Sequence, residues 1–148
     1  MKRPALVAGF FIHLCKCHRL RNLISEISVQ DNKPQSDGRK ELMLSFAKNA
    51  AAEGRHFFYI LIREPLGPVE RGKKYEDPLI EALGVEGELT GGGSQMGKGD
   101  TIEYCGIDVV VNDRAKGLEL IRKCLQLCGA SANTIIEEYM PGFNEIPL

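Results

Sequence analysis

A glycine-rich segment is the first part of this sequence whose residue types suggest chemistry. Residues 91–99 read Gly-Gly-Gly-Ser-Gln-Met-Gly-Lys-Gly, and Gly92, Gly97 and Lys98 have the spacing of a phosphate-binding loop. Gly99 stands where that loop requires a hydroxyl, and a strand rather than a helix is predicted next. We therefore interpret the run as a hairpin connection with flexible or bulged glycines. Its residues are kept as candidate ligand contacts: Gly91, Gly92, Gly93, Ser94 and Gln95.

Cysteines are the second group with possible chemistry, because thiolates bind soft metals. Cys124 and Cys128 are four residues apart and share a helical face, but no other ligand is near them in the sequence. Cys15, Cys17 and His18 are close together but lack a second pair at zinc-finger spacing. We interpret the cysteines as buried apolar residues and expect no metal and no cofactor. An odd total of five also favours a reducing compartment over a disulfide framework.

Acid–base groups do not form a catalytic set in this sequence. His56 is the only histidine in its patterned part, and it lies just before a predicted strand. Glu103 and Asp108 lie on opposite faces of one predicted strand, and Glu137 and Glu138 are adjacent in another, so the side chains of each pair diverge. We identify no catalytic residue and incline towards a protein that is not an enzyme, although residues far apart in sequence can still meet in space.

Hydrophobic periodicity sets out the elements that must position these groups. Residues 101–111 alternate most clearly, with Cys105, Ile107, Val109 and Val111 on one face of a strand. The predicted elements are, in chain order, a strand over 57–62, a loop with Gly67 and Gly72, a helix from Asp77-Pro78 to Gly84, a weak strand from Glu88, a strand over 101–111, a helix capped by Asn112 or Asp113 that ends at Gly129, and a strand from Thr134 to Pro141.

The order strand, helix, strand, strand, helix, strand resembles a ferredoxin-like domain over about residues 56–140. We expect an α+β fold of this βαββαβ type, with an antiparallel sheet and two helices on one face, preceded by an N-terminal segment. The resemblance is one of fold pattern and implies no functional residues. An RNA-binding version would stack bases on Tyr59 and Tyr104, but Glu103 and Asp108 bring negative charge to that strand, so we expect no nucleic-acid binding.

The sheet face opposite the helices is unusually apolar. Two central strands should bring aromatic and aliphatic side chains together there, where a solvated face would be polar. We expect a cover over this face: a second copy of the chain, apolar residues of 5–27 and 42–47, or another protein. The candidate binding residues are Phe57, Tyr59, Leu61, Arg63, Ile102, Tyr104 and Asp108.

Charge divides the 148 residues into two parts. Residues 1–56 hold ten basic and five acidic side chains, whereas residues 57–148 hold nine basic and fifteen acidic ones. We predict a basic N-terminal segment and linker over residues 1–42, and an α+β domain over residues 43–148. The start resembles the first two parts of a secretory signal but has no cleavage site. Two other interpretations stay open, an amphipathic N-terminal helix and translated sequence upstream of the true start.

These observations lead to two functional hypotheses. The first is a small cytoplasmic binding or regulatory protein that acts through the apolar sheet face, on a protein partner or on a second copy of itself. The alternative is a small enzyme or small-molecule-binding domain with a pocket between the sheet face and the glycine loop. The overall charge of −1 gives no case for nucleic acid, and no apolar run reaches the ~18 residues of a membrane span.

Overall fold

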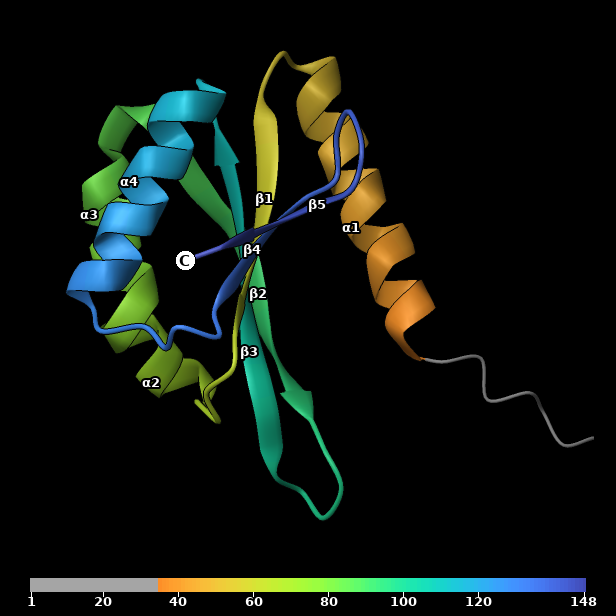
Figure 1. Cartoon of the computed structure of the whole chain (residues 1–148), viewed down its shortest axis with the longest axis vertical. Coiled ribbons are helices and arrows are strands. Elements are labelled where there is room, and N and C mark those ends of the chain that lie inside the picture. The colour runs from red at the N-terminus through yellow and green to blue at the C-terminus, as the bar shows by residue number, and fades with distance from the viewer. Residues whose placement is uncertain (1–34) are drawn as a thin grey trace, which may run out of the picture. The chain divides into compact units, whose positions relative to one another are not determined.

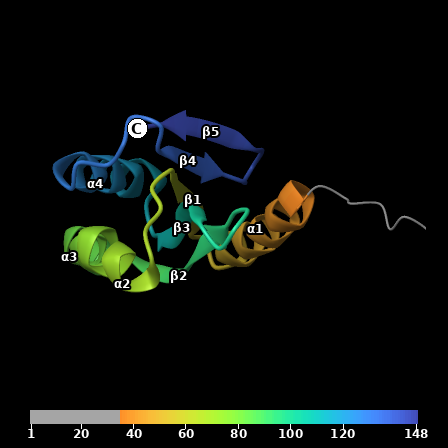
Figure 2. The same ribbon diagram turned by 90° about the horizontal axis from the view of Figure 1, so that it is seen from below.

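The structure, a computed structural model, describes residues 35–148, in which a five-stranded antiparallel sheet lies between helices. Helices α3 (Asp77–Leu83) and α4 (Arg114–Leu127) cover one face, and α1 (Gln35–Ala52) lies against the other (Figures 1 and 2). The strands are arranged β2 (Gly87–Met96), β3 (Ile102–Val111), β1 (His56–Ile62), β4 (Ile135–Glu138) and β5 (Asn144–Pro147). The predicted α+β class with an antiparallel sheet is confirmed.

The two central strands match their sequence patterns closely. Strand β1 pairs with β3 from His56 opposite Val111 to Ile62 opposite Cys105. The predicted inner face of β3 is fully buried against the helices, while its other face looks towards α1. Alternation was a reliable guide here because only one register buries every member of the apolar set.

The first helical region differs from the prediction. Residues 67–72 are not a loop, since α2 (Pro68–Arg71) begins there and passes through a π-helical turn (Gly72–Glu76) into α3. Pro68 takes the first helical position, and Glu70 accepts a hydrogen bond from the Gly67 amide. Asp77 is consequently not an N-cap. The wider turn before Pro78 accommodates a residue that lacks an N–H and whose ring would crowd a regular helix.

The glycine run differs in part from the prediction, since residues 91–96 lie within β2 and only residues 97–99 belong to the hairpin connection. Gly91, Gly92 and Gly93 pair with residues 108, 107 and 106 of β3, and a bulge interrupts the pairing between Leu89 and Gly91. The turn itself comes later, where the Gly97 amide bonds to the carbonyl of Thr101. The Asp108 side chain occupies the space that a Cβ at position 91 would require.

The second half of the domain follows its capping signals. Asp113 caps α4 by accepting a hydrogen bond from the Lys116 amide, and Gly129 follows the helix with φ +69°, a conformation that favours glycine. Ile121 and Leu125 of the predicted stripe are buried. Strand β5 and helix α1 add to the six predicted elements, so the chain is not a plain βαββαβ pattern.

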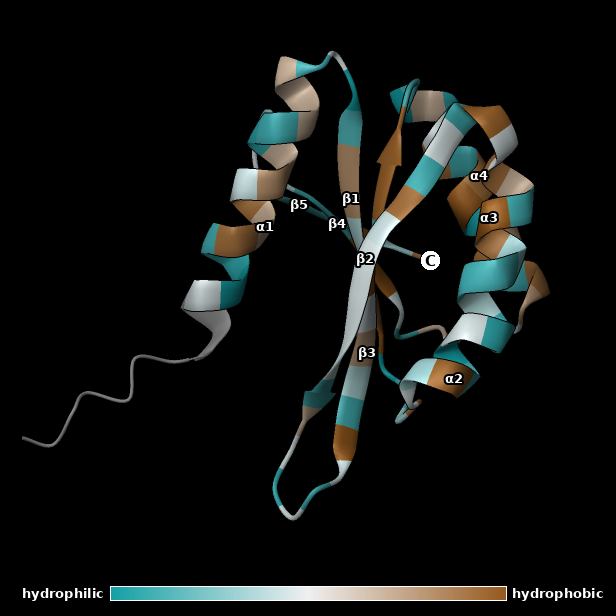
Figure 3. Ribbon diagram, turned by 180° about the vertical axis from the view of Figure 1, so that it is seen from behind, coloured by the Kyte–Doolittle hydropathy of each residue, from teal (hydrophilic) through white to brown (hydrophobic). Residues whose placement is uncertain are grey.

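Two apolar clusters hold the sheet between its layers. The larger joins α3 and α4 to the inner face and includes Phe58, Ile60, Leu79, Ile107 and Ile121. The smaller lies between α1 and the opposite face; Figure 3 shows that α1 alternates apolar and polar residues along its length. Residues 36–148 form one compact unit, and α1 runs across position 42, where the sequence suggested a boundary. The expectations about the basic start, Cys15, Cys17 and His18 lie outside the described residues.

Candidate functional site

Helix α1 covers the middle of the apolar sheet face. Met43, Ala47 and Ala50 follow the i, i+4, i+7 spacing of a helical stripe and are buried against the sheet. Beneath them Phe57, Tyr59, Leu61 and Val110 are each at most 7% exposed, together with Tyr139. Of the predicted covers, residues 42–47 of the same chain lie over this part of the face as part of α1, while residues 5–27 lie outside the described residues.

A charged network fixes the N-terminal half of α1 to the sheet. Arg39 donates two hydrogen bonds to Glu137, Nη1 to Oε2 at 2.7 Å and Nη2 to Oε1 at 2.9 Å. Tyr139 donates a third to the same carboxylate at 2.6 Å, and the Arg39 guanidinium lies 4.9 Å from the centre of the Tyr59 ring. Burial raises the pKa of Tyr59 to about 12, so this phenol is protonated at neutral pH. The network serves to hold α1 in place.

The C-terminal half of α1 overhangs a cavity on the same face of the sheet. Its volume is about 280 Å³, slightly below the ~300–1,000 Å³ typical of small-molecule pockets. Helix α1 and the turn that follows it form one wall, and β1, β2 and β3 form the floor. The lining residues are Phe46, Asn49, Ala50, Glu53, Arg55, Phe57, Glu88, Thr90, Asp108 and Val110.

Strand register places the floor residues in two rows. In the first row, Val110 of β3 lies between Phe57 of β1 and Glu88 of β2. This row is apolar on the side of the central strand β1 and charged on the side of β2. Asp108 is two residues further along β3, between Tyr59 and Gly91. Two strand residues span roughly 7 Å, so the carboxylate lies about that far from the apolar row.

Asp108 is the least satisfied polar residue of the cavity. Its Oδ1 is enclosed and has no hydrogen-bond partner within residues 35–148, and its Oδ2 lies where a Cβ at position 91 would come within 2.7 Å. Burial raises the pKa of Asp108, an effect that the charge of Arg71 partly opposes. Arg71 is itself hydrogen-bonded to Glu76 at 2.5 Å. Most buried polar atoms have partners, so an unpaired carboxylate oxygen beside a cavity suggests a missing donor.

Arg55 provides the only positive charge among the cavity's lining residues. Its Nη1 donates to Glu88 Oε1 at 2.6 Å, while its Nε is enclosed without a partner in the described part of the chain. Glu53 and Asp108 have no ion-pair partner there. The cavity therefore carries more negative than positive charge.

The structure separates the predicted site residues into groups. Phe57 and Asp108 line the cavity, while Tyr59 and Leu61 lie beneath α1. Arg63 is exposed, and Ile102 and Tyr104 are half-buried, further along the face. Within the glycine run, Gly91 adjoins Asp108, and Ser94 turns to the opposite face, where its hydroxyl donates to the Leu66 carbonyl. The remaining members do not line the cavity: Gly92, Gly93 and Gln95.

Sequence reasoning missed the α1 wall and the two polar residues on β2. Phe46 and Asn49 lie on a helix of which the sequence suggested only residues 42–47, as a possible cover. Glu53 lies in the turn after that helix, and Thr90 lies at a bulge. The stripe of Met43, Ala47 and Ala50 was the available signal, since its spacing defines the helix face that packs on the sheet.

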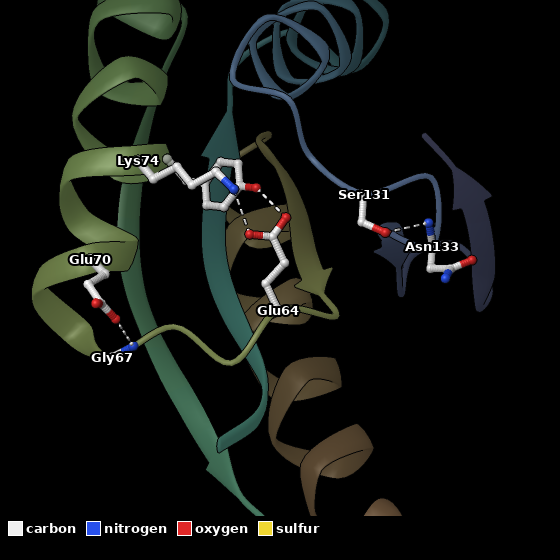
Figure 4. Close-up of polar contacts among 7 residues, drawn as sticks. Glu64, Gly67, Glu70, Lys74, Ser131 and Asn133 are labelled. Atoms are coloured by element: carbon white, nitrogen blue, oxygen red, sulfur yellow. Dashed lines mark hydrogen bonds and ion pairs between the residues drawn. The ribbon is translucent and has the colours of Figure 1, made fainter. Parts of the chain in front are cut away.

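A second polar cluster lies at the end of β1 on the other side of the sheet (Figure 4). Glu64 accepts hydrogen bonds from Lys74 and from the Tyr75 hydroxyl, both at 2.7 Å. Burial alone would raise the pKa of Glu64, but these two hydrogen bonds outweigh it and lower the pKa. Every group in this cluster is paired, so it stabilises the loop after β1 and offers no open position to a ligand.

The cysteines of the described region are apolar packing residues. Cys105 is buried, and Cys124 and Cys128 lie with their sulfurs 4.0 Å apart on α4. Burial raises the pKa of Cys124 to about 12, so its thiol is protonated at neutral pH. Within residues 35–148, no three His, Cys, Asp or Glu side chains lie close enough to hold a metal ion, and no helix has the length and apolarity needed to cross a bilayer.

Comparison with known proteins finds no matching family model, curated protein or solved structure. The function of the chain must therefore be argued from the site itself.

Proposed function

We propose that this protein binds a small molecule in the cavity between α1 and strands β1, β2 and β3. The proposal rests on Asp108, which lies at the floor of a cavity of about 280 Å³ and whose enclosed Oδ1 lacks a hydrogen bond. Leaving a buried polar atom unpaired costs ~1–3 kcal/mol, and a bound donor would recover part of that cost. The alternative drawn from the sequence was a pocket between the sheet face and the glycine-rich loop. This cavity is on that sheet face, but no residue of the glycine run lines it.

The fold supports the same proposal. We propose that the chain is a ferredoxin-like domain with two additions, β5 at one edge and α1 on the otherwise open face. The sheet order β2-β3-β1-β4 and the helices on one face are the features behind this assignment. In such a domain, α1 converts part of an open face into a concave site. Fold alone does not indicate the ligand, because this architecture has many uses.

The test fills the cavity from its helical wall. Asn49 is an exposed residue of α1 that lines the cavity, so Asn49→Trp should occupy the space without disturbing the packed stripe. Ala51→Trp adds the same ring to an exposed α1 position outside the cavity and serves as the matched control. A fragment library screened by amide chemical shifts should give hits at the cavity residues in the wild type and in Ala51→Trp, but not in Asn49→Trp. Hits that persist in Asn49→Trp, or no hits at these residues, would contradict the proposal.

A second candidate function, association of two copies, is favoured by the β2 edge. Residues 89–96 of this edge strand contain no charged residue and no proline, the usual devices against strand pairing. Sedimentation should then detect a dimer, and Gly93→Lys, placed in open space, should dissociate it. A monomer at a concentration of about 100 μM would exclude any dimer of useful affinity.

A further inference from the structure

The charges of the cavity narrow the class of ligand. Asp108 and Glu53 stand without a positive partner, while Arg55, the cavity's only cation, is engaged by Glu88. An anionic ligand would meet two carboxylates and a guanidinium whose charge is already paired with Glu88 through Nη1, although its Nε has no partner within the described residues. A cationic ligand would meet two carboxylates that have no ion-pair partner within the described residues, although the charge of Arg71 acts on Asp108 from a distance.

The apolar part of the cavity adds a second requirement. Phe46 and Phe57 meet edge to face with their ring centres 6.0 Å apart, and Val110 continues the apolar floor beside Phe57. Phe46 is 37% exposed, which leaves part of its ring available for contact. Aromatic rings favour both apolar bodies and positive charges.

The relative positions of these groups set the outline of a ligand. Asp108 lies one row along β3 from Val110, roughly 7 Å away on the same face. Asp108 lines the cavity, and its Oδ1 has no hydrogen-bond partner within the described residues. A ring or short alkyl chain over Phe57 and Val110 would therefore carry its donor group to this carboxylate.

We propose that the ligand is an organic amine, with a protonated amino group at Asp108 and an apolar body against Phe46, Phe57 and Val110. This inference rests on the proposed function, because it names the chemical class that the same cavity takes. The ammonium would donate the hydrogen bond that Asp108 Oδ1 lacks and would neutralise the charge of the carboxylate.

The experiment uses three probes of the same shape on the full chain at pH 7: benzylamine, which is then cationic, neutral benzyl alcohol and anionic benzoate. Binding is followed by titration of amide chemical shifts. We expect benzylamine to saturate at the cavity residues, with an affinity at least tenfold higher than that of benzyl alcohol, and benzoate not to bind. Asp108→Asn should lower the affinity for benzylamine at least tenfold. Glu81→Gln removes an equal charge from exposed α3 on the opposite layer and should leave it unchanged.

The outcomes distinguish this inference from the proposal beneath it. If benzyl alcohol or benzoate binds as tightly as benzylamine, and Asn49→Trp abolishes that binding, the amine class is wrong and the cavity is still a binding site. If Asp108→Asn binds benzylamine as the wild type does, the assigned role of Asp108 is wrong. If no probe or library fragment shifts the cavity residues, both proposals fail.

Discussion

Asp108 is the residue at which stability and the proposed binding role are opposed. Its raised pKa means that the folded protein holds the carboxyl proton more tightly than the unfolded chain does. This contribution to stability is complete below the ordinary Asp pKa of ~3.9 and is lost as the pH rises through the folded value. An ionised Asp108 carboxylate is therefore destabilising in the folded protein, a cost that a ligand could explain.

Replacing Asp108 with its uncharged isostere tests this reasoning. Asp108→Asn should raise the urea midpoint at pH 7, and the difference from the wild type should disappear near pH 3, where both side chains are neutral. The exposed Glu81→Gln should shift the midpoint little at either pH. A lower midpoint for Asp108→Asn at pH 7 would mean that the carboxylate makes a stabilising interaction in the free protein.

Arg39 provides the opposite case, a charge that the fold needs. Glu137 is 2% exposed and depends on Arg39 for its only ion pair in the described structure. Arg39→Ala should lower the free energy of unfolding by about 3 kcal/mol, because it leaves a buried carboxylate with only the Tyr139 hydrogen bond. Arg39→Lys should recover part of the loss, since an ammonium cannot form the two parallel hydrogen bonds. Urea unfolding measures the stability of both variants. A loss below about 1 kcal/mol for the alanine variant would contradict the prediction, because it is the loss expected for a solvent-exposed ion pair.

At the scale of elements, strands β2 and β3 pair through two glycines that differ in the space available for a side chain. Gly93 pairs with Gly106 on the α1 side of the sheet. A Cβ at Gly106 would lie 2.0 Å from the Tyr59 hydroxyl oxygen, whereas a Cβ at Gly93 would meet nothing within 4 Å. Gly106→Ala should therefore cost about 1–3 kcal/mol, because α1 holds the Tyr59 ring in place. Gly93→Ala should be neutral or stabilise by about 0.5 kcal/mol. Equal urea midpoints for the two variants would show that Tyr59 moves freely.

The same scale explains which elements the sequence could predict. Strands β1 and β3 and helix α4 carry local signals, namely alternation, an apolar stripe, the Asp113 cap and Gly129, so their positions followed directly. Helix α1 begins within a polar stretch that contains Gly38, and its position depends on distant contacts such as Arg39 with Glu137. Strand β5 is four residues long and takes its register from β4. The cavity was only half predictable for the same reason: Phe57 and Asp108 follow from strand periodicity, but the α1 wall requires tertiary packing.

On the scale of the whole molecule, α1 is the cover that makes the second face of the sheet compatible with water. Three truncated chains separate the contributions of this helix. Residues 36–148 keep the helix from its second residue, and residues 43–148 lack Arg39 but keep the buried stripe. Residues 53–148 lack the helix. The last would expose Phe57, Tyr59, Leu61 and Val110. Each large apolar side chain gains ~1.5–3 kcal/mol on burial, so the loss approaches the ~5–15 kcal/mol that stabilises a small domain.

We therefore expect 36–148 to unfold cooperatively in urea, 43–148 to do so at a lower midpoint, and 53–148 to show no cooperative transition or to aggregate. Ala47→Glu in the full chain should weaken the same interface by burying a charge, whereas Lys48→Glu, at an exposed neighbouring position, should have little effect. Cooperative unfolding of 53–148 at the midpoint of 36–148 would show that the sheet face does not need α1. The helix would then be free to leave the face, and an external partner could take its place.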